Sequence, residues 1–165
     1  MYDIALSVAA CARSGTGADV AWMVSPVVSD EAVMFPPGGG KLGTLLGGAF
    51  DGLLADVAAR QLPTGRLVEH TVNAPESAMS GLAEGTAVEF LGVPAELFPA
   101  NTWQLLLDRA PLALIASLRD GEVTDMVVQS TENARSCPSP EPCHLPMCLP
   151  RVATARYPRT RKFPG

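Results

Sequence analysis

Positive charge is scarce in the first 134 residues of this chain. They contain six lysines and arginines against sixteen aspartates and glutamates, which gives a net charge of −10. Residues 135–165 have the opposite balance, with six basic residues and one acidic residue. Because proteins bind nucleic acids largely by neutralising phosphates with basic side chains, the acidic part of the chain is not expected to have a nucleic-acid partner.

Long apolar runs and a recognisable export signal are also missing. No apolar stretch approaches the length of a membrane span. Val8-Ala9-Ala10-Cys11 resembles a bacterial lipoprotein cleavage box, but the apolar stretch before it is short and no basic residue precedes it. Its spacing instead fits an amphipathic first helix. We therefore expect a cytoplasmic protein without a membrane partner and, in that reducing compartment, without structural disulfides.

Familiar catalytic and metal-binding signatures are absent as well. The chain has no G-x-S-x-G and no H-E-x-x-H. His70 lies in an alternating segment with no evident cysteine or serine partner, so we interpret it as structural. A zinc-like ligand set occurs near the C-terminus, at Cys137, Cys143, His144 and Cys148. Its C-x5-C-H-x3-C spacing differs from the usual zinc knuckles, and no metal site is predicted.

The composition changes abruptly after Ala134. Residues 135–165 hold seven prolines and three of the four cysteines, without apolar periodicity. This predicts a domain over 1–134 and a mostly disordered tail over 135–165. The tail is either a natural basic extension or the product of a frameshift in a GC-rich gene. The other reading frames of the downstream DNA would distinguish these alternatives.

Apolar periodicity predicts about three helices, over residues 3–15, 48–62 and 99–110. Six strands are predicted, over 19–24, 32–35, 67–72, 87–93, 112–118 and 123–128. Asp120-Gly121, between the last two strands, is typical of a tight hairpin. Because helices and strands alternate only in part, we predict a single mixed α/β (α+β) domain with a mixed sheet.

Glycine is concentrated in residues 36–51, PPGGGKLGTLLGGAFD, just before an apolar-periodic segment. Flexible glycines followed by a helix N-terminus are typical of a cradle for a phosphate-bearing ligand. Residues 38–43 formally match the dinucleotide fingerprint G-x-G-x-x-G, but Gly47-Gly48 interrupt the helix that this fingerprint requires. A Walker A loop fails because Leu42 stands where a hydroxyl must hold magnesium. The remaining alternative is a tight loop without a ligand.

Two segments resemble a known family. Residues 40–51, GKLGTLLGGAFD, resemble the G-x-x-G-S-x-S-G-G-C-x-E signature of the XdhC/CoxI family. Residues 76–86, ESAMSGLAEGT, resemble its second signature, G-L-x-C-G-G, of which Gly81, Leu82 and Gly85 are kept. The following sequence as far as Gly121 is also similar, so that the resemblance covers most of residues 1–130.

The resemblance implies an accessory protein rather than an enzyme. Members of this family assist the maturation of molybdenum hydroxylases such as xanthine and carbon-monoxide dehydrogenases. They are thought to bind molybdenum cofactor (molybdopterin) and deliver it to the apo-enzyme. The implied partner is a molybdenum-hydroxylase subunit, and a homodimer is compatible with this role. The residues implied to contact cofactor, or to orient groups beside it, are Gly43, Thr44, Gly47, Gly48, Asp51, Gly81, Glu84 and Gly85.

The chain departs from the family pattern at both signature cysteines. Ala49 and Glu84 stand at these positions. Neither can replace a thiolate as a soft ligand for molybdenum or sulfur. Many members also continue into a Rossmann-like domain, where this chain has residues 135–165. These departures favour the alternative of a remnant or interaction module that docks a dehydrogenase subunit without cofactor. A nucleotide-dependent enzyme ranks last, because no acid, base or nucleophile has a useful spacing.

Overall fold

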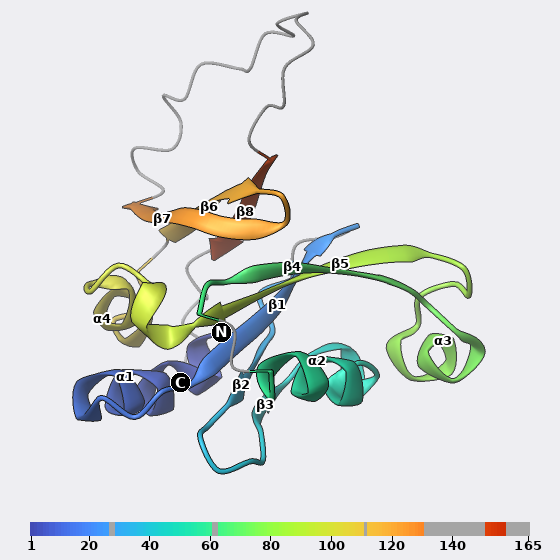
Figure 1. The fold of residues 1–165 in the computed structure, drawn as a ribbon, viewed down its shortest axis with the longest axis horizontal. Coiled ribbons are helices and arrows are strands. Elements are labelled where there is room, and N and C mark those ends of the chain that lie inside the picture. The colour runs from blue at the N-terminus through green and yellow to red at the C-terminus, as the bar shows by residue number, and fades with distance from the viewer. Residues whose placement is uncertain (27–28, 61–62, 111, 131–150, 158–165) are drawn as a thin grey trace, which may run out of the picture.

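A single antiparallel sheet organises the chain (Figure 1). The computed structural model describes residues 1–26, 29–60, 63–110, 112–130 and 151–157. Within them, eight strands are arranged in the order β3-β2-β1-β5-β4-β7-β6-β8. Their bounds are β1 (Asp19–Ser25), β2 (Ala32–Phe35), β3 (Leu42–Thr44), β4 (Arg66–Thr71), β5 (Ala87–Pro94), β6 (Leu112–Arg119), β7 (Glu122–Ser130) and β8 (Arg151–Tyr157).

The predicted mixed α/β class is confirmed, but the expectation of a mixed sheet is wrong. Every described strand pairing is antiparallel. The reason is the connectivity, since β1–β2, β2–β3 and β6–β7 are neighbours both in the chain and in the sheet. Short connections of this kind join antiparallel strands, whereas a parallel pair needs a long crossover.

Four α-helices and three short 3₁₀ turns accompany the described strands. They are η1 (Tyr2–Ile4), α1 (Ala5–Ser14), η2 (Leu46–Gly48), α2 (Asp51–Ala58), α3 (Ala74–Ser80), η3 (Ala95–Leu97) and α4 (Thr102–Leu107). Three predicted helices correspond to α1, α2 and α4. The second begins at Asp51 rather than Gly48, because the glycines form a separate 3₁₀ turn before it. The helix α3 was not predicted.

Two hydrophobic cores lie against the sheet, and β1 contributes to both. Val20 and Trp22 belong to a core shared with α1 and α4. Ala21 and Met23 belong to the other, with residues of α2 and β5. Because successive strand residues point to opposite faces, this alternation places one core on each face. Figure 1 shows α1 and α4 apart from α2 and α3. The strand β1 is buried, as predicted, because a hydrophobic core covers each of its two faces.

The hairpin predicted at Asp120-Gly121 is confirmed. Both residues have positive φ, 53° and 80°, as a tight hairpin between twisted strands requires. The turn also joins β7 to the rest of the sheet, because the Gly121 carbonyl accepts from the Leu67 amide at 2.7 Å. A second bond of 2.7 Å runs from the Val123 amide to the Gly65 carbonyl.

Strand β8 falls within the segment predicted to be a disordered tail. Its seven residues pair with β6 from Leu112↔Tyr157 to Leu118↔Arg151. For these residues the structure differs from the prediction, because β6 supplies main-chain partners that composition does not reveal. The rest of the predicted tail, including its cysteines and histidine, lies outside the described residues. No helix in the described ranges is long and apolar enough to cross a membrane.

Candidate functional site

The first glycine segment folds into a strand, a 3₁₀ turn and a helix. β3 pairs with β2 and leads into η2, after which α2 begins at Asp51. Leu46 and Gly47 both have positive φ, 49° and 65°. The Leu46 amide donates to the Glu31 carboxylate at 2.7 Å. The turn is therefore built on left-handed backbone, and one of its amides is occupied by a side chain of the same chain.

Beside this turn, Lys41 forms an ion pair with Asp51. Oδ2 of Asp51 accepts from Lys41 Nζ, whereas Oδ1 is buried without a hydrogen-bond partner among the described residues. Gly48 lies directly against this pair. A Cβ atom at Gly48 would be 2.8 Å from Asp51 Oδ2, and φ at this residue is +84°. Glycine is thus favoured by the backbone conformation, and any side chain at this position would have to displace the carboxylate.

The second glycine segment follows α3. Asn73 and Glu76 form a capping box, in which the Glu76 amide donates to Asn73 Oδ1 at 2.9 Å and the Asn73 amide donates to Glu76 Oε2 at 2.9 Å. The helix ends at Gly81, with φ of +74°. The Gly85 amide then donates to the Val72 carbonyl at 2.8 Å, which closes the loop back onto the end of β4.

The structure brings these two glycine segments together. A Cβ atom at Gly47 would be only 3.2 Å from the Met79 carbonyl oxygen, so η2 approaches the last turn of α3 closely. A second contact runs through His70 on β4 and joins α3 to Phe50, which lies between η2 and α2. Its ring lies edge-on to Phe50, with 6.0 Å between ring centroids, and its Nε2 is 2.8 Å from Glu76 Oε2. The two signature-like segments therefore form one region of the surface.

The predicted site residues differ in solvent exposure and in whether their amides already have hydrogen-bond partners. Several are exposed, namely Thr44, Gly47, Gly81, Glu84 and Gly85, while Gly43, Gly48 and Asp51 are half-buried. The Gly48 amide donates to the Leu45 carbonyl at 3.0 Å, so this amide and that of Gly85 already have partners within the chain. Gly43 is held between β2 and η1, where it serves packing.

Glu76 is the titratable group of this region with a shifted pKa. Burial alone would raise the pKa of its carboxyl. The hydrogen bonds from the Asn73 amide and from His70 outweigh that effect and hold the pKa below its usual range. A carboxylate with a lowered pKa stabilises the fold at neutral pH, and this stabilisation is lost as the pH falls through the folded-state pKa.

Replacing Glu76 with glutamine should lower the free energy of unfolding at pH 7 by about 1 kcal/mol, because an amide oxygen accepts the hydrogen bonds from the Asn73 amide and from His70 more weakly than a carboxylate does. The deficit should shrink as the pH falls from 4.5, the ordinary pKa of glutamate, through the lower folded-state pKa, because the wild-type carboxylate becomes protonated over that range. Urea unfolding at several pH values between 3 and 7 measures both effects. Glu84→Gln, at an exposed position outside the capping box, is the control. A constant deficit across this range would contradict the assignment.

No thiol lies in this region among the described residues. The one cysteine that they include is Cys11, on α1, where it packs against the first core. Ala49 is half-buried beside η2. The described residues also contain no group of three or more histidines, cysteines, aspartates or glutamates placed to hold a metal ion.

A separate cleft of about 640 Å³ lies beside the β2–β3 connection. Its walls come from residues 36–40 of that connection, from α2 and from the ends of β1 and β5. Three carboxylates line it, those of Asp19, Asp56 and Glu96. Burial, followed by the negative charge of Glu96, raises the pKa of Asp19. The sequence did not reveal this cleft, because its acidic residues come from three distant segments.

The fold is shared with a protein of known structure. That protein is described as a xanthine dehydrogenase from Bacillus halodurans, and its structure superposes with a TM-score of 0.57 at 18% sequence identity. The match covers 95% of this chain and 53% of the other, so the chain spans about half the length of its neighbour. At this identity the likeness shows the fold alone. No protein-family model and no curated protein sequence matches the chain.

Proposed function

We propose that this chain is an accessory protein for molybdenum hydroxylases, which binds molybdenum cofactor and presents it to an apo-dehydrogenase. The observation that carries the proposal is the meeting of the two signature-like segments, where Gly47 approaches the Met79 carbonyl. Gly47 and Met79 are 32 positions apart in the sequence, and a shared ligand gives a reason for both segments. The fold likeness to a structure described as a xanthine dehydrogenase adds weaker support.

The residues of this region suit the organic end of the cofactor. A pterin edge offers N–H donors, and the buried Asp51 Oδ1 is an acceptor without a partner among the described residues. Lys41, beside Asp51, supplies a positive charge for the phosphate. Gly47 is exposed and without a side chain, which permits close approach of a flat ring to the backbone.

The metal end of the cofactor is not matched in the same way. Molybdenum and sulfur call for a soft thiolate, and Ala49 and Glu84 offer none. When bound, the cofactor would supply the redox chemistry of the recipient dehydrogenase. The role of this chain would be to hold the organic part until transfer.

A docking module that binds a dehydrogenase subunit without cofactor is the second candidate. It is favoured by Glu31, whose carboxylate accepts a hydrogen bond from the Leu46 amide, so that this amide of the glycine turn is not available to a cofactor. Two exposed apolar side chains also flank the region, Leu42 at 45% and Met79 at 58%. Capture of the subunit that is equally strong with and without cofactor would favour this candidate over the first.

Gly48→Val tests the first proposal. The new side chain would displace the Asp51 carboxylate and break its pairing with Lys41. We expect saturable binding of purified molybdenum cofactor to the wild-type chain and at least tenfold weaker binding to the variant. Fluorescence titration under anaerobic conditions measures both affinities.

Gly15→Val is the matched control, because Gly15 also has positive φ, +67°, but has open space around it at the end of α1. It imposes similar backbone strain without touching the site. Thermal unfolding of both variants separates lost binding from lost folding. Absence of saturable binding to the wild-type chain, or equal binding to Gly48→Val, would overturn the proposal.

A further inference from the structure

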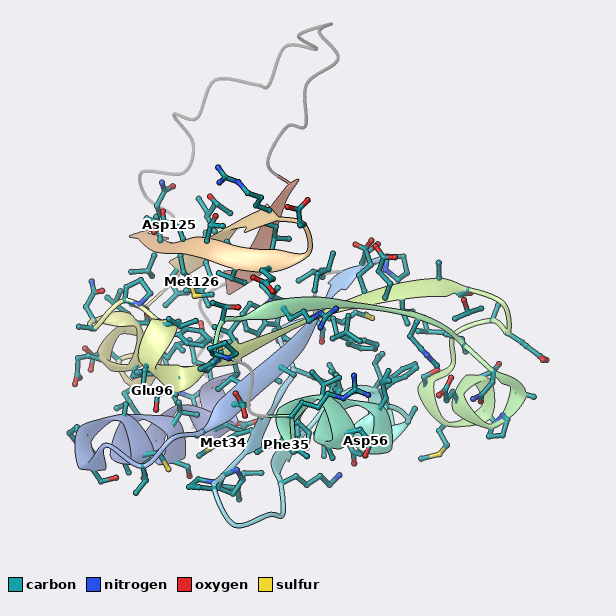
Figure 2. All side chains as sticks on the ribbon, in the orientation of Figure 1. Met34, Phe35, Asp56, Glu96, Asp125 and Met126 are labelled. Atoms are coloured by element: carbon teal, nitrogen blue, oxygen red, sulfur yellow. The ribbon has the colours of Figure 1, made fainter. Side chains whose placement is uncertain are left out.

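The acidic cleft is a cavity of ligand size, and its lining does not include η2 or residues 81–85. Its volume of about 640 Å³ falls within the range of small-molecule sites. Figure 2 labels Glu96, Phe35 and Asp56, which lie in that order from left to right across the view. The three carboxylates thus come from different elements, with Asp19 on β1, Asp56 on α2 and Glu96 on η3.

The charge of the lining has one sign. Among the described lining residues there is no lysine, arginine or histidine. Asp19 is half-buried, and the neighbouring Glu96 disfavours its ionised form. An electrostatic cost of this kind is relieved by a bound positive charge.

The rest of the lining is apolar and flat. Phe35, Pro36, Pro37 and Pro94 provide rings, and alanines of α2 form the facing wall. A small void of about 20 Å³ shares Asp19, Phe35 and Pro94 with the cleft and extends toward Leu54 and Val57 under α2. Such a lining suits an apolar body attached to a charged end.

We propose that this cleft binds a small organic cation, whose amine, amidinium or guanidinium end lies between Asp19 and Glu96. Its apolar body packs against Phe35 and the prolines. A metal ion is a poorer occupant, since no set of metal-ligating side chains is assembled in the described residues. This inference is independent of the proposed cofactor role, which concerns η2 and the turn after α3, whose residues do not line the cleft.

Benzamidine and benzamide form a matched pair of probes, because they have nearly the same shape and only benzamidine is charged. Isothermal titration of the full chain should show saturable benzamidine binding at least tenfold tighter than that of benzamide. Raising the sodium chloride concentration from 50 to 500 mM should weaken it, as expected for an interaction between charges. Equal binding of the two probes, or none of either, would overturn the inference.

Variants of the carboxylates locate the binding. Asp19→Asn and Glu96→Gln should each weaken benzamidine binding about tenfold. Asp125→Asn removes the same charge from β7, away from the cleft (Figure 2), and should change it by less than twofold. An equal loss in all three variants would show a nonspecific charge effect and refute the site. Thermal unfolding confirms that each variant is folded, and Asp19→Asn is expected to be at least as stable as the wild type at pH 7 because it removes repulsion from Glu96.

The Gly48→Val variant keeps the two proposals distinguishable. It should retain full benzamidine affinity, because Gly48 is not part of the cleft lining. Loss of benzamidine binding in this variant while it remains folded would contradict a separate cleft. Failure of molybdenum cofactor to bind the wild-type chain would leave the benzamidine result unaffected.

Discussion

Replacing Gly43 with alanine is expected to destabilise the fold by about 3–5 kcal/mol, from backbone strain combined with overpacking. Gly43 has φ of +83°, and its Cβ would lie 2.4 Å from the Ala32 carbonyl oxygen and 2.7 Å from Ile4 Cγ2. The Ala32 carbonyl belongs to the backbone of β2, which pairs with β3 at this point. It cannot move away without disturbing the strand pairing. Urea unfolding at pH 7 measures the loss.

Gly40→Ala separates the two causes. Gly40 has a similar φ of +89°, but nothing lies within 4 Å of the added atom. It should cost only about 1–2 kcal/mol, the contribution of strain alone. If both variants lost the same stability, the close approach to Ala32 would not be the decisive feature. A Gly43→Ala chain that is unfolded from the outset agrees with the prediction.

Replacing Phe50 with alanine should cost about 3–5 kcal/mol, the usual range for removing a buried phenylalanine. The side chain is 1% exposed and packs 4.9 Å from Phe90, measured between ring centroids. It also contacts His70 and sits immediately before α2. Its loss therefore leaves a cavity in the second core directly beneath the glycine turn.

The measurement is again urea unfolding, supplemented by cofactor titration of the folded fraction. Leu6→Ala provides the contrast, because Leu6 is a large apolar residue that is 64% exposed. It should change stability by less than about 0.5 kcal/mol. A loss below 1 kcal/mol for Phe50→Ala would show that the second core closes over the cavity without cost.

Local patterns predicted most of the fold. The alternation in β4, the Asp120-Gly121 turn and the helix α1 ending at Gly15 all depend on neighbours within a few positions. The helix α3 was missed because it has no buried residue and thus no apolar stripe. Its signal was present in Asn73 and Glu76, the capping box, with Pro75 in the first turn. Strand β8 had no such signal, because its partner β6 lies more than thirty residues earlier.

Of the candidate site, only the glycine-rich segments could be predicted from the sequence. Clustered glycines indicated left-handed backbone, and Gly48 shows it. The pairing of Glu31 with the Leu46 amide and the approach of Gly47 to Met79 connect residues 15 and 32 positions apart, which no local pattern encodes. The acidic cleft depends in the same way on tertiary structure, since its three carboxylates come from separate elements.

The alternation of β1 between two cores also determines how firmly the strand is held in place. Trp22, the largest of its side chains, fills one core beside Phe98, at 5.8 Å between ring centroids, and the next core receives the small Ala21. A shift by one residue would exchange these sides. The indole would then be forced into the space of a methyl group, and a void would open beside Phe98. The sizes of these side chains thus fix the register of β1. Substitutions along β1 that change one core will also affect the packing of the other.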